Sequence, residues 1–108
     1  MELKTIEEVR ALFAKDRYAT DSGAYIEEIG EHYAKCSIRL DERHRNAVGS
    51  VMGGVYFTLA DFTFAVATNW KKPEVVSLNS TVTYLAPAKG ELLIAEAFCV
   101  KEGKATNC

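Results

Sequence analysis

Asp61 is the one acidic or basic side chain between Arg45 and Lys71, in a stretch that has the pattern of a buried helix. A carboxylate in such a segment is costly to desolvate, so one that faces a pocket is a candidate nucleophile or general base. Two structural interpretations remain open. The side chain can bond a neighbouring backbone amide, or it can face solvent at the edge of an imperfect amphipathic helix.

The residues around Asp61 favour the chemical interpretation. Spacings of four, three, four and three residues place a polar strip on one side of the predicted helix, made of Gly54, Thr58, Asp61, Ala65 and Thr68. Bulky side chains flank this strip at Val55, Tyr56, Leu59, Phe62 and Val66. We therefore expect the bulky side chains to pack on a sheet and the polar strip to line a cleft.

Gly53 and Gly54 stand where this helix is predicted to begin. The first N–H groups of a helix and the positive end of its dipole can stabilise negative charge that develops on a carbonyl oxygen. Glycine also lets a ligand approach the backbone closely. A tight turn or close helix–sheet packing would explain the pair equally well. Taken alone, Asn46 is typical of a turn and Ser77 of the open face of a strand.

The remaining pattern predicts an α+β fold of one domain, residues 1–108, in which an antiparallel sheet wraps around the long central helix. Thr5 and Glu8 have the form of a capping box before a short helix. The predicted elements are a helix at 5–15, strands at 24–30 and 33–40, a loop at 41–50, a helix from about 53, strands at 75–85 and 91–101, and the start of a further strand.

Composition excludes several other classes of protein. The net charge of −2 provides no basic stripe, so nucleic acid is not an expected partner. Three cysteines without CxxC spacing indicate free thiols, and His32 and His44 lack ligand spacing, so no metal site is expected. The long run after Arg45 contains Asn46, three glycines, three threonines and, near its middle, Asp61, so it does not have the pattern of a membrane-spanning helix. No signal pattern precedes the first helix. We therefore expect a soluble cytoplasmic protein that does not enter the membrane.

Three segments together resemble one family. They are Asn46 to Gly54, Leu59-Ala60-Asp61, and Thr83-Tyr84-Leu85-Ala86-Pro87 with Gly90. From about residue 20 onward the chain resembles the hotdog-fold acyl-CoA thioesterases of the phenylacetate-degradation (PaaI-like) type. Met52 is a departure, because many members carry His at this position.

The resemblance implies a role for each matched residue. Asp61 would be the nucleophile or the general base, and the backbone N–H of Gly53, with Gly54 beside it, would polarise the thioester carbonyl. Asn46 would orient the water or the thioester, and Ser77 would help to hold the attacking water. We expect substrate to contact Met52 and the other members of the polar strip, namely Gly54, Thr58, Ala65 and Thr68. Coenzyme A is part of the substrate, and no cofactor is expected.

Helix geometry predicts that two chains share each site. Gly53 and Asp61 are eight residues apart, which is about 12 Å along a helix that rises about 1.5 Å per residue. Both groups cannot reach one carbonyl from the same helix, since each must come within about 3 Å of the reacting atoms. We therefore expect a homodimer whose two central helices run antiparallel. The resemblance implies that such dimers can pair into homotetramers.

The leading functional hypothesis is a thioesterase that hydrolyses a small or aromatic acyl-CoA. The alternative is a non-catalytic hotdog module that binds an acyl ligand or serves assembly. A hotdog dehydratase is disfavoured, because those enzymes use a His that neither His32 nor His44 supplies at the helix start.

The resemblance also concerns the C-terminus. The family sheet resembles a six-stranded one whose last two strands lie between the fourth and the third. By that pattern the last two strands are missing here, and we expect either a truncated chain or a gap filled by a partner or by rearranged pairing. Direct pairing of 75–85 with 91–101 in a closed sheet would contradict this expectation.

Overall fold

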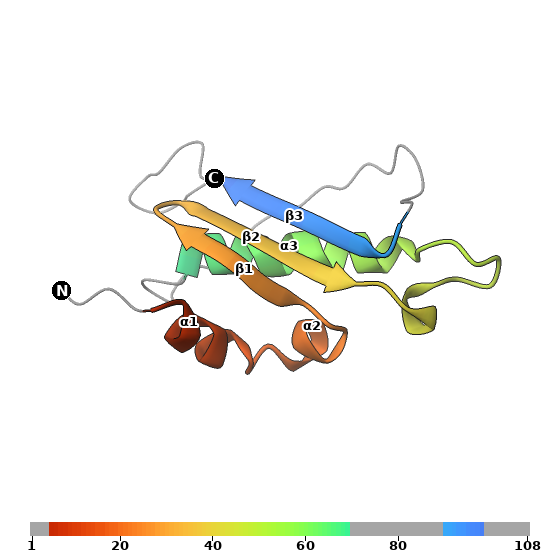
Figure 1. The fold of residues 1–108 in the computed structure, drawn as a ribbon, viewed down its shortest axis with the longest axis horizontal. Coiled ribbons are helices and arrows are strands. Elements are labelled where there is room, and N and C mark those ends of the chain that lie inside the picture. The colour runs from red at the N-terminus through yellow and green to blue at the C-terminus, as the bar shows by residue number, and fades with distance from the viewer. Residues whose placement is uncertain (1–4, 70–89, 99–108) are drawn as a thin grey trace.

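The computed structural model describes residues 5–69 and 90–98, and every structural statement below concerns them. The described part of the chain forms three α-helices, one 3-10 helix and three strands (Figure 1). In order they are α1 (Ile6–Phe13), α2 (Arg17–Asp21), β1 (Tyr25–Gly30), β2 (Tyr33–Arg39), the short 3-10 helix η1 (Glu42–His44), α3 (Gly53–Asn69) and β3 (Leu92–Phe98).

The strands form one antiparallel sheet in the order β1-β2-β3. Alternation along β2 follows the sequence pattern, because Ala34, Cys36 and Ile38 are all fully buried. The β1–β2 turn includes His32, whose φ of 54° lies in the left-handed region. A bulge between Ile26 and Glu28 shifts the register of β1. The predicted hairpin at 24–40 is thus confirmed.

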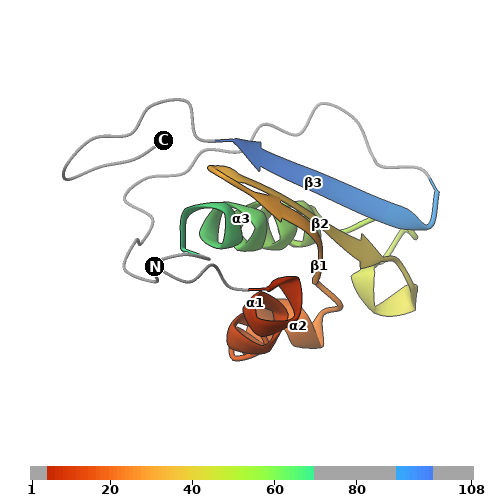
Figure 2. The same ribbon diagram turned by 60° about the vertical axis from the view of Figure 1, so that its left-hand side comes forward.

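The helix α3 lies along one face of this sheet and supplies the centre of the core (Figures 1 and 2). Its side chains Leu59, Phe62 and Val66 are buried at exposures of 1%, 3% and 0%. The helices α1 and α2 lie beside β1 in both views. From there Phe13 meets Phe62 edge-on, with ring centroids 6.1 Å apart, so α1 closes the core next to α3.

Strand β3 presents its larger apolar side chains to the exposed side of the sheet. Leu92, Ile94 and Phe98 are 44%, 50% and 65% exposed. The alternate residues Leu93, Ala95 and Ala97 pack against the core. Strict alternation is therefore present, and three large apolar side chains of the strand face outward together with Glu96.

The α+β class is confirmed, but the helix α2 and the 3-10 helix η1, which lies within the predicted loop at 41–50, were not predicted. The predicted helix at 5–15 is shorter and ends at Phe13, the central helix begins at Gly53, and the strand expected from 91 begins at Leu92. No element was predicted where the five-residue helix α2 lies. The predicted strand at 75–85 and its pairing lie outside the described residues and stay predictions.

Candidate active site

The start of α3 is anchored by a histidine that is itself buried. The His44 ring is 2% exposed, and its Nδ1 accepts a hydrogen bond of 3.0 Å from the Asp41 backbone N–H. The other ring nitrogen, Nε2, therefore carries the proton and donates to the Ser22 carbonyl at 2.6 Å. The His44 carbonyl accepts from the Met52 N–H at 2.8 Å. One residue thus ties the end of α2 to the residue that precedes α3.

Asn46 organises the turn between this anchor and the helix. Its side-chain oxygen accepts from the N–H groups of Val48 and Ser50, at 3.1 and 3.0 Å. The Asn46 N–H donates to the Ser50 carbonyl, and Gly49 continues the turn with a φ of 86°. The side-chain oxygen therefore has the local role that asparagine commonly has in turns.

Gly53 and Gly54 form the first two residues of α3, directly after Met52, whose side chain is 58% exposed. Neither glycine has a positive φ, so the backbone conformation does not require glycine at these positions. A Cβ at Gly54 would meet nothing within 4 Å among the described residues. Close packing within the described part of the chain therefore does not explain Gly54.

Asp61 lines a cavity of about 400 Å³ between α2 and α3. The α3 wall consists of Phe57, Thr58, Asp61, Phe62 and Ala65. Three members of the polar strip, Thr58, Asp61 and Ala65, are thus brought to one cavity, as expected. The strip's two end residues are placed elsewhere: Gly54 lies at the helix start, and the Thr68 hydroxyl donates to the Phe64 carbonyl at 2.9 Å.

Asp61 is exposed to solvent in the single chain, which is one of the two structural interpretations that the sequence left open. The α3 helix buries only the side that packs on the sheet, and the Asp61 side chain is exposed. The cavity is open enough that the carboxylate keeps contact with solvent. Ser77, the remaining predicted site residue, lies outside the described residues.

The second wall of the cavity comes from residues that no pattern in the sequence indicates. They are Asp16, Arg17, Tyr18 and Ala19, at the start of α2. Arg17 forms a two-point ion pair with Asp21 at 3.1 and 3.0 Å. This hydrogen bonding, and then the charge of Asp21, raise the pKa of Arg17. No periodic pattern marks this short segment, so only the spatial neighbourhood of α3 identifies it.

Other reactive side chains do not join this cavity. Burial raises the pKa of the Cys36 thiol to about 11, although a hydrogen bond with Thr63 acts in the opposite direction. A thiol in that state is not an activated nucleophile. Within residues 5–69 and 90–98, no three His, Cys, Asp or Glu side chains are grouped to hold a metal ion. No helix in the same ranges is long and apolar enough to cross a bilayer.

Comparison with known proteins identifies relatives of this chain. The family model described as "Thioesterase superfamily" matches residues 48–107. A "Putative esterase" of Archaeoglobus fulgidus is 34% identical over 96 residues, covering 88% of this chain and 62% of the relative. Human "Acyl-coenzyme A thioesterase 13" is 36% identical over 72 residues, covering 64% of this chain and 51% of the relative. The chain thus spans less than two thirds of the length of these two relatives.

A third relative matches along almost the whole chain. "Acyl-coenzyme A thioesterase PaaI" of Escherichia coli is 30% identical over 108 residues, covering 99% of this chain and 77% of the relative. The solved structure of the E. coli PaaI protein superposes with a TM-score of 0.79 at 29% identity. That superposition covers 87% of this chain and 69% of the other. The family match, this relative and the sheet packed on α3 together show that the chain belongs to the thioesterase superfamily and has its hotdog fold.

Proposed function

We propose that the protein is an acyl-CoA thioesterase that hydrolyses a small or aromatic acyl-CoA, with Asp61 as the catalytic carboxylate. The observation that carries this proposal is the position of Asp61 in an aromatic-lined cavity of a thioesterase-superfamily chain. Two of the relatives described above are named acyl-CoA thioesterases. Hydrolysis of a thioester with coenzyme A as the leaving thiol is therefore the reaction to test first, and it requires no further cofactor.

The cavity suits an acyl group of limited size. Its volume of about 400 Å³ lies near the lower end of the range of ligand pockets, about 300–1,000 Å³. The rings of Tyr18, Phe57 and Phe62 offer apolar surface, whereas Thr58 and Asp61 supply the polar groups. An aromatic or short aliphatic acyl group can contact the rings while its carbonyl carbon lies near the carboxylate.

Asp61 can act in either of two ways. As a nucleophile, its oxygen bonds to the carbonyl carbon, the C–S bond breaks, and water then hydrolyses the resulting anhydride. As a general base, it takes a proton from a water molecule whose oxygen attacks the same carbon. In both routes the sulfur leaves as the thiol of coenzyme A and the acyl group leaves as a carboxylic acid.

The start of α3 would polarise the carbonyl through backbone amides at Gly53 and Gly54. Donors in the first turn of a helix, together with the helix dipole, favour negative charge at that point. The open space beside Gly54 supports this role, because a substrate can approach there without meeting a side chain. Met52 would contact the substrate at the same place, and Asn46 and Ser77 would orient the thioester or the attacking water.

These amides and Asp61 would come from different chains. The helix α3 includes both Gly53 and Asp61, which are about 12 Å apart along its axis. We therefore propose a homodimer with two shared sites, which can further pair into a homotetramer.

Release of free thiol from a panel of acyl-CoAs tests the activity. We expect turnover of small or aromatic esters, and a chain that binds these esters but releases no thiol would instead be the non-catalytic acyl-binding module.

Asp61→Asn should keep the fold and lower kcat by about 10²–10⁴-fold. Glu42→Gln is the matched control, because Glu42 is an exposed carboxylate that is not among the residues lining the cavity. Met52→His should be tolerated. Near-normal hydrolysis by Asp61→Asn would overturn the assignment.

Subunit mixing tests the shared site. Gly53→Pro removes a backbone donor, and proline is accepted in the first turn of a helix. This variant and Asp61→Asn should each be inactive alone, but mixed dimers should regain activity at one of their two sites. Absence of rescue after verified subunit exchange would contradict the two-chain site.

A further inference from the structure

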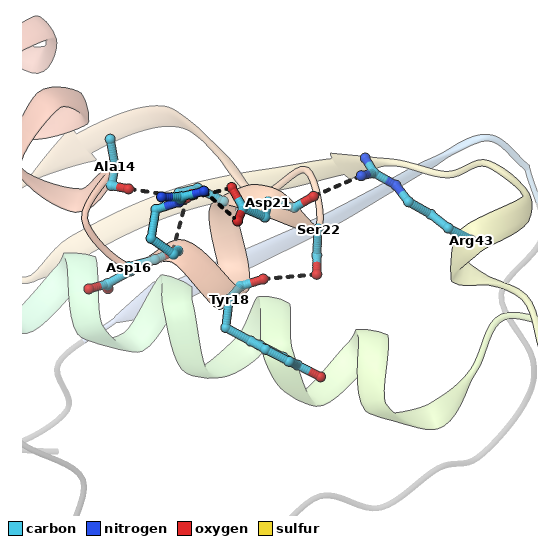
Figure 3. A network of polar contacts seen from close by, with 8 residues as sticks. Ala14, Asp16, Tyr18, Asp21, Ser22 and Arg43 are labelled. Atoms are coloured by element: carbon cyan, nitrogen blue, oxygen red, sulfur yellow. Dashed lines mark hydrogen bonds and ion pairs between the residues drawn. The ribbon is translucent and has the colours of Figure 1, made fainter.

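The α2 wall of the cavity includes an aromatic ring that the core does not use. Tyr18 is 81% exposed, although it lines the cavity together with Phe57 and Phe62 of α3. Figure 3 shows its side chain leaving α2 and extending along α3. Ala19 is the buried residue of α2, so Tyr18 contributes little to packing. Its ring is free to contact a ligand in the cavity.

Polar contacts hold the backbone that carries this ring. The Ser22 hydroxyl donates to the Tyr18 carbonyl at 2.9 Å, and the Arg43 guanidinium donates to the Asp21 carbonyl at 2.7 Å (Figure 3). The His44 ring donates to the Ser22 carbonyl. Contacts from the segment before α3 thus fix the position of α2, and Tyr18 stands on a preorganised wall. A wall of this kind can discriminate between ligands by size.

We infer that Tyr18 is a specificity-determining residue whose ring limits the length of the acyl group accepted beside Asp61. This inference rests on the proposed function. A short or aromatic acyl group fits between the Tyr18 ring and the α3 wall, where it contacts apolar surface on both sides. A longer chain must displace the ring. Removal of the ring extends the cavity toward solvent, whereas a larger ring shortens it.

The experiment compares acetyl-, butyryl-, octanoyl- and phenylacetyl-CoA with the wild type, Tyr18→Ala, Tyr18→Phe and Tyr18→Trp. Tyr18→Ala should raise the octanoyl/butyryl ratio of kcat/KM about tenfold. A change of about tenfold is the lower limit of the discrimination that one methylene group provides in an apolar pocket. Tyr18→Trp should lower this ratio, and Tyr18→Phe should leave it unchanged. Tyr25→Ala is the matched control, since Tyr25 is an exposed tyrosine on β1 and is not among the residues that line the cavity.

The Kd values of the same esters are measured by calorimetry in the Asp61→Asn background. If the wild type releases no thiol, the proposed function fails, and the octanoyl/butyryl ratio of Kd then decides the inference by itself. A Tyr18→Ala shift in favour of the longer ester, in kinetics or in binding, supports the inference. An unchanged ratio in Tyr18→Ala and Tyr18→Trp, or an equal change in Tyr25→Ala, overturns it.

Discussion

The two N-terminal helices are held against the rest of the molecule by opposite kinds of contact. The helix α1 buries Val9 and Phe13, at exposures of 0% and 6%, and begins with a complete capping box. The helix α2 buries only Ala19, and its N-cap residue makes no side-chain cap bond. Instead, Arg43 and His44 hold its C-terminal carbonyls.

This difference indicates that α1 contributes mainly to the stability of the fold, whereas α2 can contribute to substrate selectivity. The buried side chains of α1 belong to the core, where Phe13 contacts Phe62 of α3. The Phe62 side chain also lines the cavity. The α2 wall contributes little apolar burial, so its surface side chains can change at small cost to the fold. Elements that contact ligands commonly belong to the less stable parts of a structure. We expect substrate selectivity to be altered more readily through α2 than through α1.

The largest expected difference between the two helices is the loss of stability when one aromatic side chain is truncated in each. Phe13→Ala should destabilise the fold by about 3–5 kcal/mol, because it leaves a cavity next to Phe62. Tyr18→Ala should change stability by less than about 0.5 kcal/mol, since the ring is exposed. Denaturant unfolding measures both values. Equal losses in the two variants would show that α2 is packed as firmly as α1.

A smaller effect is expected when the histidine anchor of α2 is shortened. His44→Asn cannot reach both the Asp41 N–H and the Ser22 carbonyl, so one of these partly buried backbone groups loses its partner, at a cost of about 1–3 kcal/mol. Amide hydrogen exchange should accelerate in α2 and remain slow in α1. His32→Asn is the matched control, because asparagine tolerates the positive φ found there. Unchanged exchange in α2 would contradict the anchoring role.

The smallest effect is expected at the two helix starts. The Thr5 hydroxyl accepts from the Glu8 N–H at 3.2 Å, and the Glu8 carboxylate accepts from the Thr5 N–H at 3.0 Å. Thr5→Ala should therefore cost about 1 kcal/mol. Asp16→Ala should cost less, because Asp16 makes no corresponding bond in α2. Thermal unfolding of the two variants checks this order, and a larger loss for Asp16→Ala would reverse the comparison.

Local pattern in the sequence was sufficient for most of the fold. The strand predicted at 33–40 has a period of two, which puts Ala34, Cys36 and Ile38 on one face, and all three are buried. Helical spacing placed Thr58, Asp61 and Ala65 on one side of α3, which the structure brings to one cavity. The two glycines marked the helix start at Gly53. Each of these predictions depends on neighbours within a few turns or residues along the chain.

Tertiary contacts decided what lies opposite those faces. A helix of five residues is marginal by itself, and α2 is held by Arg43 and His44, each 22 residues from the carbonyl it binds. No periodicity in so short a segment could predict the wall formed by Tyr18. A period of two likewise puts Leu92, Ile94 and Phe98 on one side of β3, but it does not indicate that this side is exposed. The sequence by itself determined which side chains share a face, because that follows from backbone geometry, and only the packing of distant elements decided which face meets solvent, core or cavity.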